Sequence, residues 1–241
     1  SKKIFDLAEN ILDFDIKDVC FNENTMINLT EYTQAAILVA STAMYEAVKS
    51  MGICPDVCCG LSLGEYNALI SSGVMKFEDA VKVVRKRGFL MQEAVPKGKG
   101  TMMAVLGLEE KIVEDVCNEV DGIVSIANYN CPGQLVISGE KNAVISGGEI
   151  MKNRGAKRVV ELNVSGPFHS EMLIQAGENL GKFLKDIKLE NPVIPYVANV
   201  NGEYIYKSDV IKSLLEKQVS SPVKFQQSIK NMIENDVNIF I

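Results

Sequence analysis

The sequence predicts an α/β protein in which a larger α/β-hydrolase-like domain with a parallel sheet carries an inserted ferredoxin-like subdomain. Helix and strand patterns alternate on both sides of a central stretch, and a glycine-flanked serine follows a short apolar segment. The central stretch itself has the order β-α-β-β-α-β. We therefore assign residues 1–100 and 165–241 to the larger domain and residues 101–164 to the subdomain.

The elements of the larger domain follow from apolar periodicity and its breaks. Alanines hold helical spacing before Pro55 breaks the pattern, and Gly73 closes the helix that follows the serine motif. The predicted elements are helices at 30–51, 65–72 and 77–95 and strands at 56–59 and 237–241. Because the chain opens directly on a helical pattern and stops inside an apolar strand, we interpret this domain as incomplete at both ends.

The central stretch has its own order of elements, with a turn containing Pro132-Gly133 between its two middle strands. The predicted elements are strands at 101–108, 122–128, 134–138 and 157–164 and helices at 109–120 and 141–154. This is the split βαβ arrangement, which we interpret as a subdomain inserted into the larger domain.

The composition of the chain argues against several classes of protein. Of 241 residues, 47% are hydrophobic and 23% charged, as in ordinary globular proteins, and no apolar run approaches the roughly 20 residues that span a bilayer. The first residues contain no signal-peptide core, so we expect a cytoplasmic location. A net charge of −6 argues against nucleic acid. One histidine, and six cysteines without paired C-x-x-C units, argue against a metal site.

Gly60-Leu61-Ser62-Leu63-Gly64 matches G-x-S-x-G between a strand and a helix, the context of a nucleophile elbow. Such a sharp turn projects the serine hydroxyl from the sheet and leaves no room for side chains at the flanking glycines. The helix behind it offers free backbone N–H groups to an oxyanion. The alternative is an ordinary glycine-rich turn.

A serine needs a general base to act as a nucleophile, and His169 is the only histidine of the chain. It follows a predicted strand, where a loop crosses the rim of a sheet. A lone histidine is more often a packed or surface residue, but the elbow favours a pair of Ser62 and His169. No acidic residue can be assigned from the sequence as the group that orients His169.

Arg87 lies inside the apolar arc of the predicted helix at 77–95. An unpaired guanidinium there would cost several kcal/mol, so we expect it to meet an anion. One candidate partner is a carboxylate of the protein itself. The other is a carboxylate on the substrate, gripped by the bidentate fork of the guanidinium.

Together these motifs resemble the acyltransferases that load malonyl groups onto acyl carrier protein. The resemblance covers essentially the whole chain and rests on five ordered motifs: Gly60-Leu61-Ser62-Leu63-Gly64-Glu65-Tyr66, Arg87-Gly88-x-x-Met91-Gln92, Asn128-x-Asn130-x-Pro132-Gly133-Gln134, Pro167-Phe168-His169-Ser170 and Ser221-Pro222-Val223. An inserted ferredoxin-like subdomain is also typical of this family.

The resemblance implies a ping-pong transfer in fatty-acid biosynthesis. Ser62 would attack the thioester of malonyl-CoA, with His169 taking its proton and the backbone N–H of Leu63 in the oxyanion hole. Arg87 would pair with the free malonyl carboxylate. CoA leaves, and the phosphopantetheine thiol of acyl carrier protein then attacks malonyl-Ser62. Both thioesters are substrates, so no cofactor is implied, and Phe168 resembles the malonyl-selective version of the family.

Three departures from the family's pattern bear on activity. Leu61 stands where the family often has histidine, beside the nucleophile but not as its base. The family's N-terminal Gly-Gln-Gly loop, which gives a second oxyanion donor, has no counterpart here, and neither has its C-terminal Gly-Pro-Gly loop. The resemblance places the carbonyl that orients the histidine near that second loop. Losing one oxyanion donor costs roughly 10² to 10³ in turnover.

Two rival functions stay open. A serine esterase or thioesterase shares the elbow, but it has no need of Arg87 in the apolar arc and uses water as acceptor. The second rival is a catalytically impaired fragment that only docks a carrier protein. The sequence does not decide between a stand-alone enzyme and a module of a larger synthase, and we expect a monomer.

Two basic clusters predict where an acidic carrier protein docks. The first is an exposed face of the helix that carries Arg87, formed by Lys82, Arg85 and Lys86. The second lies on the subdomain and consists of Lys152, Arg154, Lys157 and Arg158. The alternative is that both clusters are merely solvated.

Overall fold

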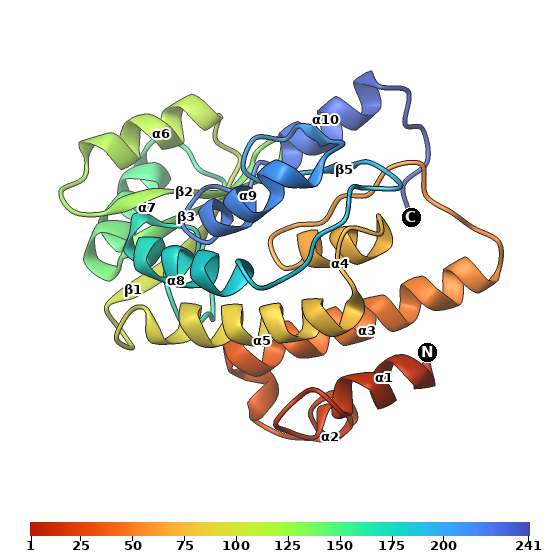
Figure 1. The fold of residues 1–241 in the computed structure, drawn as a ribbon. Helices are drawn as coiled ribbons and strands as arrows, with labels where there is room; N and C mark the ends of the chain where they lie inside the picture. Colours follow the sequence, from red (N-terminus) through yellow and green to blue (C-terminus); the bar gives the residue numbers. More distant parts are fainter.

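The computed structural model describes all residues, 1–241, and its elements gather around two main apolar cores (Figure 1). The α-helices are α1 (Lys2–Glu9), α2 (Ile16–Phe21), α3 (Thr30–Ser50), α4 (Gly64–Ser71), α5 (Phe77–Glu93), α6 (Glu110–Glu119), α7 (Lys141–Asn153), α8 (Ile174–Leu184), α9 (Ile211–Gln218) and α10 (Phe225–Glu234). The strands are β1 (Gly100–Leu106), β2 (Val124–Cys131), β3 (Gln134–Glu140), β4 (Arg158–Glu161), β5 (Tyr196–Val197) and β6 (Tyr204–Ile205). Three short 3₁₀ helices are η1 (Met26–Asn28), η2 (Glu171–Leu173) and η3 (Ser208–Val210).

A four-stranded antiparallel sheet in the order β2-β3-β1-β4 lies at one side of the molecule with α6 and α7 (Figure 1). The register of its central pair runs from Gly100 opposite Glu140 to Leu106 opposite Gln134. Val105, Ile137 and their neighbours pack with the two helices into a core of 13 buried residues, which is separate from the larger core. The chain order β1-α6-β2-β3-α7-β4 is the one that the sequence predicted.

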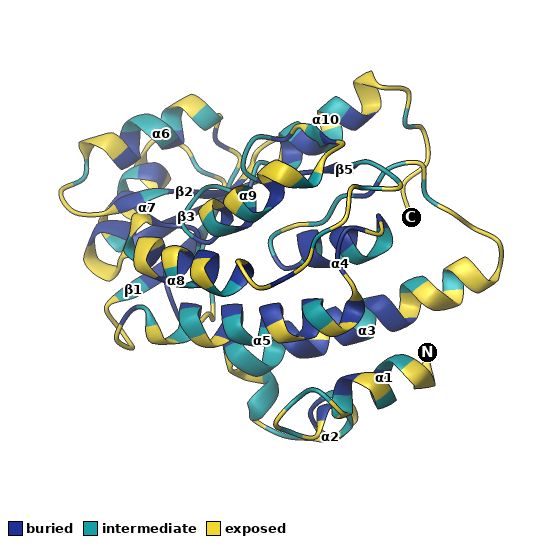
Figure 2. Cartoon of the chain, viewed as in Figure 1, coloured by how far each residue is buried: buried dark blue, intermediate teal, exposed yellow.

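The larger core lies among the remaining helices. In Figure 1, α3 and α5 run side by side across the molecule, with α1 and α2 on their outer side. In Figure 2, residues coloured as buried recur along both long helices and over much of α4. In α4 the buried residues include Glu65 and Tyr66, so this short helix behind the serine motif is enclosed by the protein.

The larger part of the chain does not form the predicted multi-stranded parallel sheet. Its segments make two isolated parallel bridges, Cys58 with Tyr196 and Asn128 with Val223, and β5 and β6 pair as a short antiparallel hairpin. Within the strand predicted at 56–59, only Cys58 makes backbone hydrogen bonds, to Pro195 and Val197. Because one residue cannot build a ladder, the observed fold is α/β with a mainly antiparallel sheet.

The strand predicted at 237–241 is wrong. These residues have no regular secondary structure, and Ile239 and Ile241 are 78% and 92% exposed. A strand needs a neighbour for its N–H and C=O groups, and no segment of the chain pairs with this one. None of the helices combines the length and apolar character needed to cross a bilayer.

Candidate active site

Ser62 occupies the sharp turn between the Cys58 bridge and α4, with a backbone φ of 53°. This left-handed backbone is costly for a residue with a side chain, and such strain often marks a functional position. A side chain at Gly60 would overlap the carbonyl of Gly64, so close packing requires the first glycine. A side chain at Gly64 would meet nothing within 4 Å, so the prediction that both glycines lack room is wrong for the second.

The structure brings Ser62 and His169 together. The Ser62 hydroxyl oxygen Oγ lies 2.7 Å from His169 Nε2, and the other ring nitrogen, Nδ1, lies 2.8 Å from the backbone carbonyl of Gln218. A carbonyl only accepts hydrogen bonds, so Nδ1 carries the proton and Nε2 presents its lone pair to the serine. The group that orients His169, which the resemblance placed near the family's C-terminal loop, is in this structure the backbone carbonyl of Gln218.

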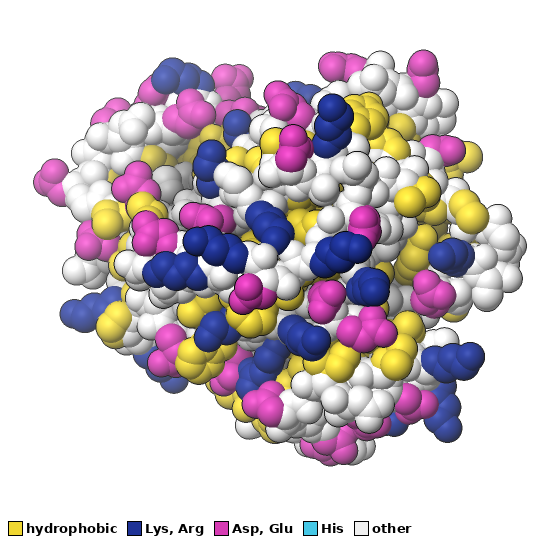
Figure 3. All heavy atoms as spheres, in the orientation of Figure 1, with side chains coloured by type: hydrophobic (Ala, Val, Ile, Leu, Met, Phe, Trp, Pro, Cys, Tyr) yellow, Lys and Arg dark blue, Asp and Glu magenta, His cyan; other side chains and the backbone are white.

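The environment of His169 keeps its imidazole neutral. Its side chain is buried, and Figure 3 shows no histidine on the face where lysines, arginines and acidic residues intermingle. Burial, with a smaller contribution from the charge of Arg87, lowers the pKa of His169 to about 4. Both causes disfavour the imidazolium, so the proton-accepting form dominates at neutral pH.

Arg87 is 1% exposed on the inner side of α5 and reaches Ser62. Its Nη2 donates to Ser62 Oγ at 3.1 Å and to the side-chain oxygen of Gln218 at 3.0 Å, and its Nη1 donates to Gln34 Oε1 at 2.7 Å. Burial lowers the pKa of Arg87, but a guanidinium stays charged in proteins. Arg87 forms no salt bridge, so the first partner predicted for it, a carboxylate of the protein, is not in contact with it.

The backbone N–H of Leu63 stands at the start of α4, directly after Ser62. It donates no hydrogen bond within the chain, whereas the next two N–H groups donate to the carbonyls of Leu61 and Ser62. A free N–H at a helix start is a ready donor to an anion. The structure therefore leaves the predicted oxyanion donor available.

Four buried polar side chains that the sequence analysis did not single out complete the site: Gln34, Glu65, Asn199 and Gln218. Asn199 accepts a hydrogen bond from Ser62 N–H at 2.7 Å, and Gln218 Nε2 donates to the Ser62 carbonyl at 2.9 Å. The only available signal was position, because Glu65 lies within the serine motif and Gln218 shortly precedes Ser221-Pro222-Val223. Nothing in the pattern indicates that Gln218 reaches a residue 156 positions away.

The basic clusters are less cationic than predicted. Arg85 is bound by two acids, Asp13 at 3.0 Å and Glu31 at 2.5 Å, and its side chain is only 20% exposed. It is therefore not part of a free cationic face. Two further ion pairs are Lys82 with Asp79 and Arg154 with Glu119. The members without a salt bridge are Lys86, Lys152, Lys157 and Arg158.

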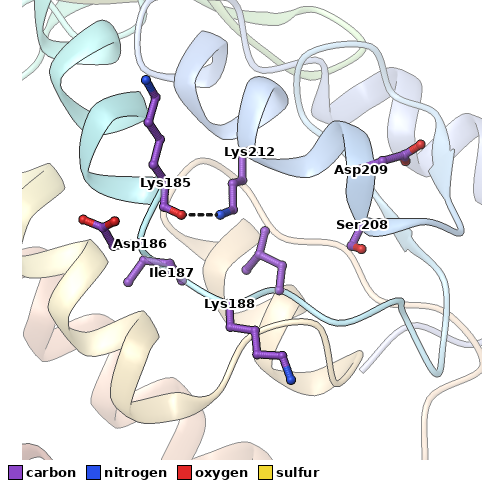
Figure 4. A pocket seen from close by; sticks show the side chains of 8 residues that line it. Lys185, Asp186, Ile187, Lys188, Ser208, Asp209 and Lys212 are labelled. Carbon is purple, nitrogen blue, oxygen red and sulfur yellow. Dashed lines mark hydrogen bonds between the residues drawn. The ribbon is translucent and has the colours of Figure 1, made fainter.

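A surface cleft between the end of α8 and the start of α9 lies apart from these residues (Figure 4). Lysines and aspartates line most of it, and Lys212 Nζ donates to the Lys185 carbonyl at 2.9 Å. No residue of the Ser62 site lines this cleft. No group of three or more His, Cys, Asp or Glu side chains is arranged to hold a metal ion.

A serine paired with a histidine whose second nitrogen is fixed, beside a free backbone N–H, is an arrangement for acyl transfer through a serine ester. Residues 6–241 match the model of a family described as the acyl transferase domain, and the chain belongs to this family.

Known proteins of similar sequence and structure carry more particular names. The chain is 40% identical to the malonyl CoA-acyl carrier protein transacylase of Bacillus subtilis, with 100% of this chain and 77% of that protein covered. It superposes on the crystal structure of a malonyl CoA-acyl carrier protein transacylase from Clostridium perfringens with a TM-score of 0.93 and 43% identity, covering 97% of this chain and 75% of that one. The chain is also similar to a chain in a solved structure described as a type II PKS acyl-carrier protein in complex with its malonyl-transacylase. That match has a TM-score of 0.94 and 36% identity, and it covers 98% of this chain and 78% of that one.

Proposed function

We propose that this chain transfers a malonyl group from malonyl-CoA to the phosphopantetheine thiol of acyl carrier protein, in fatty-acid biosynthesis, through a malonyl-Ser62 intermediate. The names of relatives at 40% and 43% identity support the reaction, and a similar structure that contains a carrier protein supports the acceptor. One observation in the site carries the proposal. Arg87 is buried without a salt bridge to any acid of the protein and donates to Ser62 Oγ at 3.1 Å.

In the first half-reaction, Ser62 Oγ attacks the thioester carbonyl while His169 Nε2 takes the hydroxyl proton. The new C–O bond pushes an electron pair onto the carbonyl oxygen, which the Leu63 N–H stabilises. The intermediate collapses as the C–S bond breaks, and His169 returns the proton to the departing CoA thiolate. In the second half-reaction the carrier thiol attacks the Ser62 ester, with the same residues acting in reverse.

Arg87 gives a physical reason for the preference for malonyl. A malonyl group on Ser62 carries a free carboxylate two bonds beyond its ester carbonyl, within the region that the guanidinium faces. A hydrogen bond to a charged group contributes about 1.5–3 kcal/mol. An acetyl group has no such carboxylate and would leave the guanidinium facing only neutral partners. We therefore expect Arg87 to favour malonyl-CoA by about one to two orders of magnitude.

The rival functions differ in what accepts the acyl group. An esterase or thioesterase would release the acyl group from Ser62 to water, and it would have no use for a buried arginine beside the nucleophile. A docking fragment without activity would form no adduct on Ser62. The pairing of Ser62 with His169 at 2.7 Å favours an active nucleophile over that second rival.

Several finer features belong to the same proposal. The chain is a monomer in the cytoplasm that needs no cofactor. Residues 1–100 and 165–241 form an α/β-hydrolase-like catalytic domain, in which Cys58 makes one parallel bridge with Tyr196, and residues 101–164 form the inserted subdomain. The acidic carrier docks at the basic residues that lack salt bridges, Lys86 on α5 and Lys152, Lys157 and Arg158 on the subdomain. If reversing these four charges leaves the carrier KM unchanged at low salt, the docking surface lies elsewhere.

The test is intact-mass spectrometry after brief incubation with malonyl-CoA or acetyl-CoA. We expect a malonyl adduct on the wild type, none on Ser62→Ala, and on Arg87→Ala a malonyl rate lowered by about 10- to 100-fold with little change for acetyl. Arg85→Ala is the matched control, because it removes an arginine from the same helix that faces Asp13 and Glu31 instead of Ser62.

Two outcomes would contradict the proposal. Absence of any adduct on the folded wild type would leave a hydrolase or a docking domain. Rapid hydrolysis of the adduct, unaffected by the carrier thiol, would identify a hydrolase.

A further inference from the structure

Glu65 is a buried carboxyl that the transfer chemistry does not use. It lies in the first turn of α4, three residues after the nucleophile, and its side chain is fully buried. It forms no salt bridge with any cation of the chain. The charge of Arg87 acts on this carboxyl only from beyond salt-bridge distance, which offsets part of the cost of burial. Keeping a carboxyl out of water without a direct ion pair is costly, so its retention beside the nucleophile needs a reason.

The hydrogen bonds of Glu65 lead to the two segments that shape the site. Its Oε2 accepts from the Gln218 side chain at 2.6 Å and from the Asn199 backbone N–H at 3.3 Å. Asn199 in turn accepts from the Ser62 N–H through its side-chain oxygen. One carboxyl oxygen therefore joins α4 to the segment after β5 and to the end of α9.

The side-chain amide of Gln218 can be oriented in only one way. Arg87 has donors only, so the amide oxygen of Gln218 must face it, and the NH₂ group must face Glu65 and the Ser62 carbonyl. The main-chain carbonyl of the same residue accepts from His169 Nδ1. Fixing the side chain of Gln218 therefore also fixes the group that orients the base.

We propose that Glu65 is a positioning residue, whose buried carboxyl holds Gln218 so that the Gln218 carbonyl keeps His169 in the tautomer and orientation that serve Ser62. This inference rests on the proposed function. Burial raises the pKa of Glu65 to about 7, yet a carboxyl offers an acceptor oxygen in both protonation states. Positioning therefore requires an acceptor at Oε2 and not a negative charge.

Two substitutions separate the acceptor from the charge. Glu65→Gln keeps an acceptor oxygen, whereas Glu65→Leu fills a similar volume without one. At saturating malonyl-CoA we expect Glu65→Gln to form malonyl-Ser62 within about threefold of the wild-type rate, and Glu65→Leu to lose about 10- to 100-fold. Because Glu65 does not face the substrate carboxylate, KM for malonyl-CoA should change by less than about threefold.

The single histidine allows a measurement that does not depend on substrate. In the ¹⁵N NMR spectrum of the imidazole, the wild type and Glu65→Gln should show one tautomer, protonated at Nδ1, and Glu65→Leu a mixture of the two. Gln226→Leu is the matched control. Gln226 is a buried amide that donates to Glu110 at 2.7 Å and does not contact Ser62, so its loss should lower Tm and leave the tautomer unchanged.

A milder variant covers the case in which Glu65→Leu does not fold. Glu65→Asp withdraws the acceptor by one methylene, and it should lower the acylation rate and admit some of the second tautomer. If Glu65→Leu or Glu65→Asp shows only the Nδ1-protonated tautomer and acylates at the wild-type rate, the positioning role is overturned. Absence of a malonyl adduct on the wild type overturns the proposed function instead, and the NMR comparison still decides whether Glu65 positions His169.

Discussion

The sheet unit of β1–β4 with α6 and α7 and the site around Ser62 are held together by different kinds of contact. In the sheet unit, antiparallel strands pair in regular register and apolar side chains such as Ile137 fill a core of its own. In the site, polar side chains bond across separations in sequence that reach 53 positions for Arg87 with Gln34 and 156 for Gln218 with Ser62. The first unit follows from patterns along the chain, and the second exists only once the chain has folded.

This difference predicts that stability and chemistry can be separated. The apolar core of the sheet unit contributes free energy through burial, which is non-directional and roughly proportional to the apolar area removed from water. The site depends on hydrogen bonds whose direction sets a tautomer and an angle of attack. Damage to the first region should therefore lower stability while the folded molecules keep their acylation rate.

The largest expected effect is on stability, from Ile137→Ala in β3. Ile137 is fully buried in the core of the sheet unit, so its truncation should lower the free energy of unfolding by about 2 to 5 kcal/mol. Below the new Tm, the rate of malonyl-Ser62 formation should stay within about twofold of the wild type, since the side chain does not contact the site. Denaturant unfolding and single-turnover mass spectrometry measure the two quantities. A rate loss that matches the stability loss would show that the regions are not separable.

How far the sequence could predict each region follows from the same difference. The elements from 100 to 161 were predictable because glycine, proline and apolar spacing act locally. Ser62, His169 and Arg87 were predictable because each is an exception to its local pattern: a serine between glycines, a lone histidine, and a cation in an apolar arc. Glu65 and Gln218 carry no such exception. Their roles come from burial and from partners distant in the chain. The strand predicted at 237–241 failed for a similar reason, because a strand also depends on a distant segment to pair with, and this one has none.

A smaller effect separates the two glycines of the serine motif. An added Cβ at Gly60 would overlap the Gly64 carbonyl, so Gly60→Ala must displace the turn that carries Ser62. We expect it to lower the unfolding free energy by about 2 to 3 kcal/mol and to slow acylation at least about tenfold. Gly64→Ala meets open space at the start of α4, and because alanine favours a helix it should stabilise by up to about 1 kcal/mol. Equal effects of the two variants on rate would show that the turn is set elsewhere.

The smallest expected effect is the response of acylation to mild acid. Since burial and Arg87 hold the pKa of His169 at about 4, the base stays neutral from pH 7 to pH 5, and the rate of malonyl-Ser62 formation should fall by less than about twofold. A histidine with an ordinary pKa of about 6.5 would lose about 20- to 30-fold over this range. Single-turnover quench with mass detection at each pH isolates this half-reaction from the carrier thiol.

The free energy of unfolding should also depend on pH over a similar range, and the pKa of His169 fixes the sign of that dependence. Between pH 6.5 and about 4 the unfolded chain binds a proton at His169 and the folded chain does not, so this residue makes folding less favourable as pH falls. Replacing His169 by Gln should remove that contribution, and the difference in unfolding free energy between variant and wild type should grow in favour of the variant as pH falls from 6.5. The opposite result would be a difference in unfolding free energy that stays constant over this range, together with an acylation rate that drops near pH 6.5. It would mean that water reaches the imidazole of His169 and that its pKa is not lowered by burial.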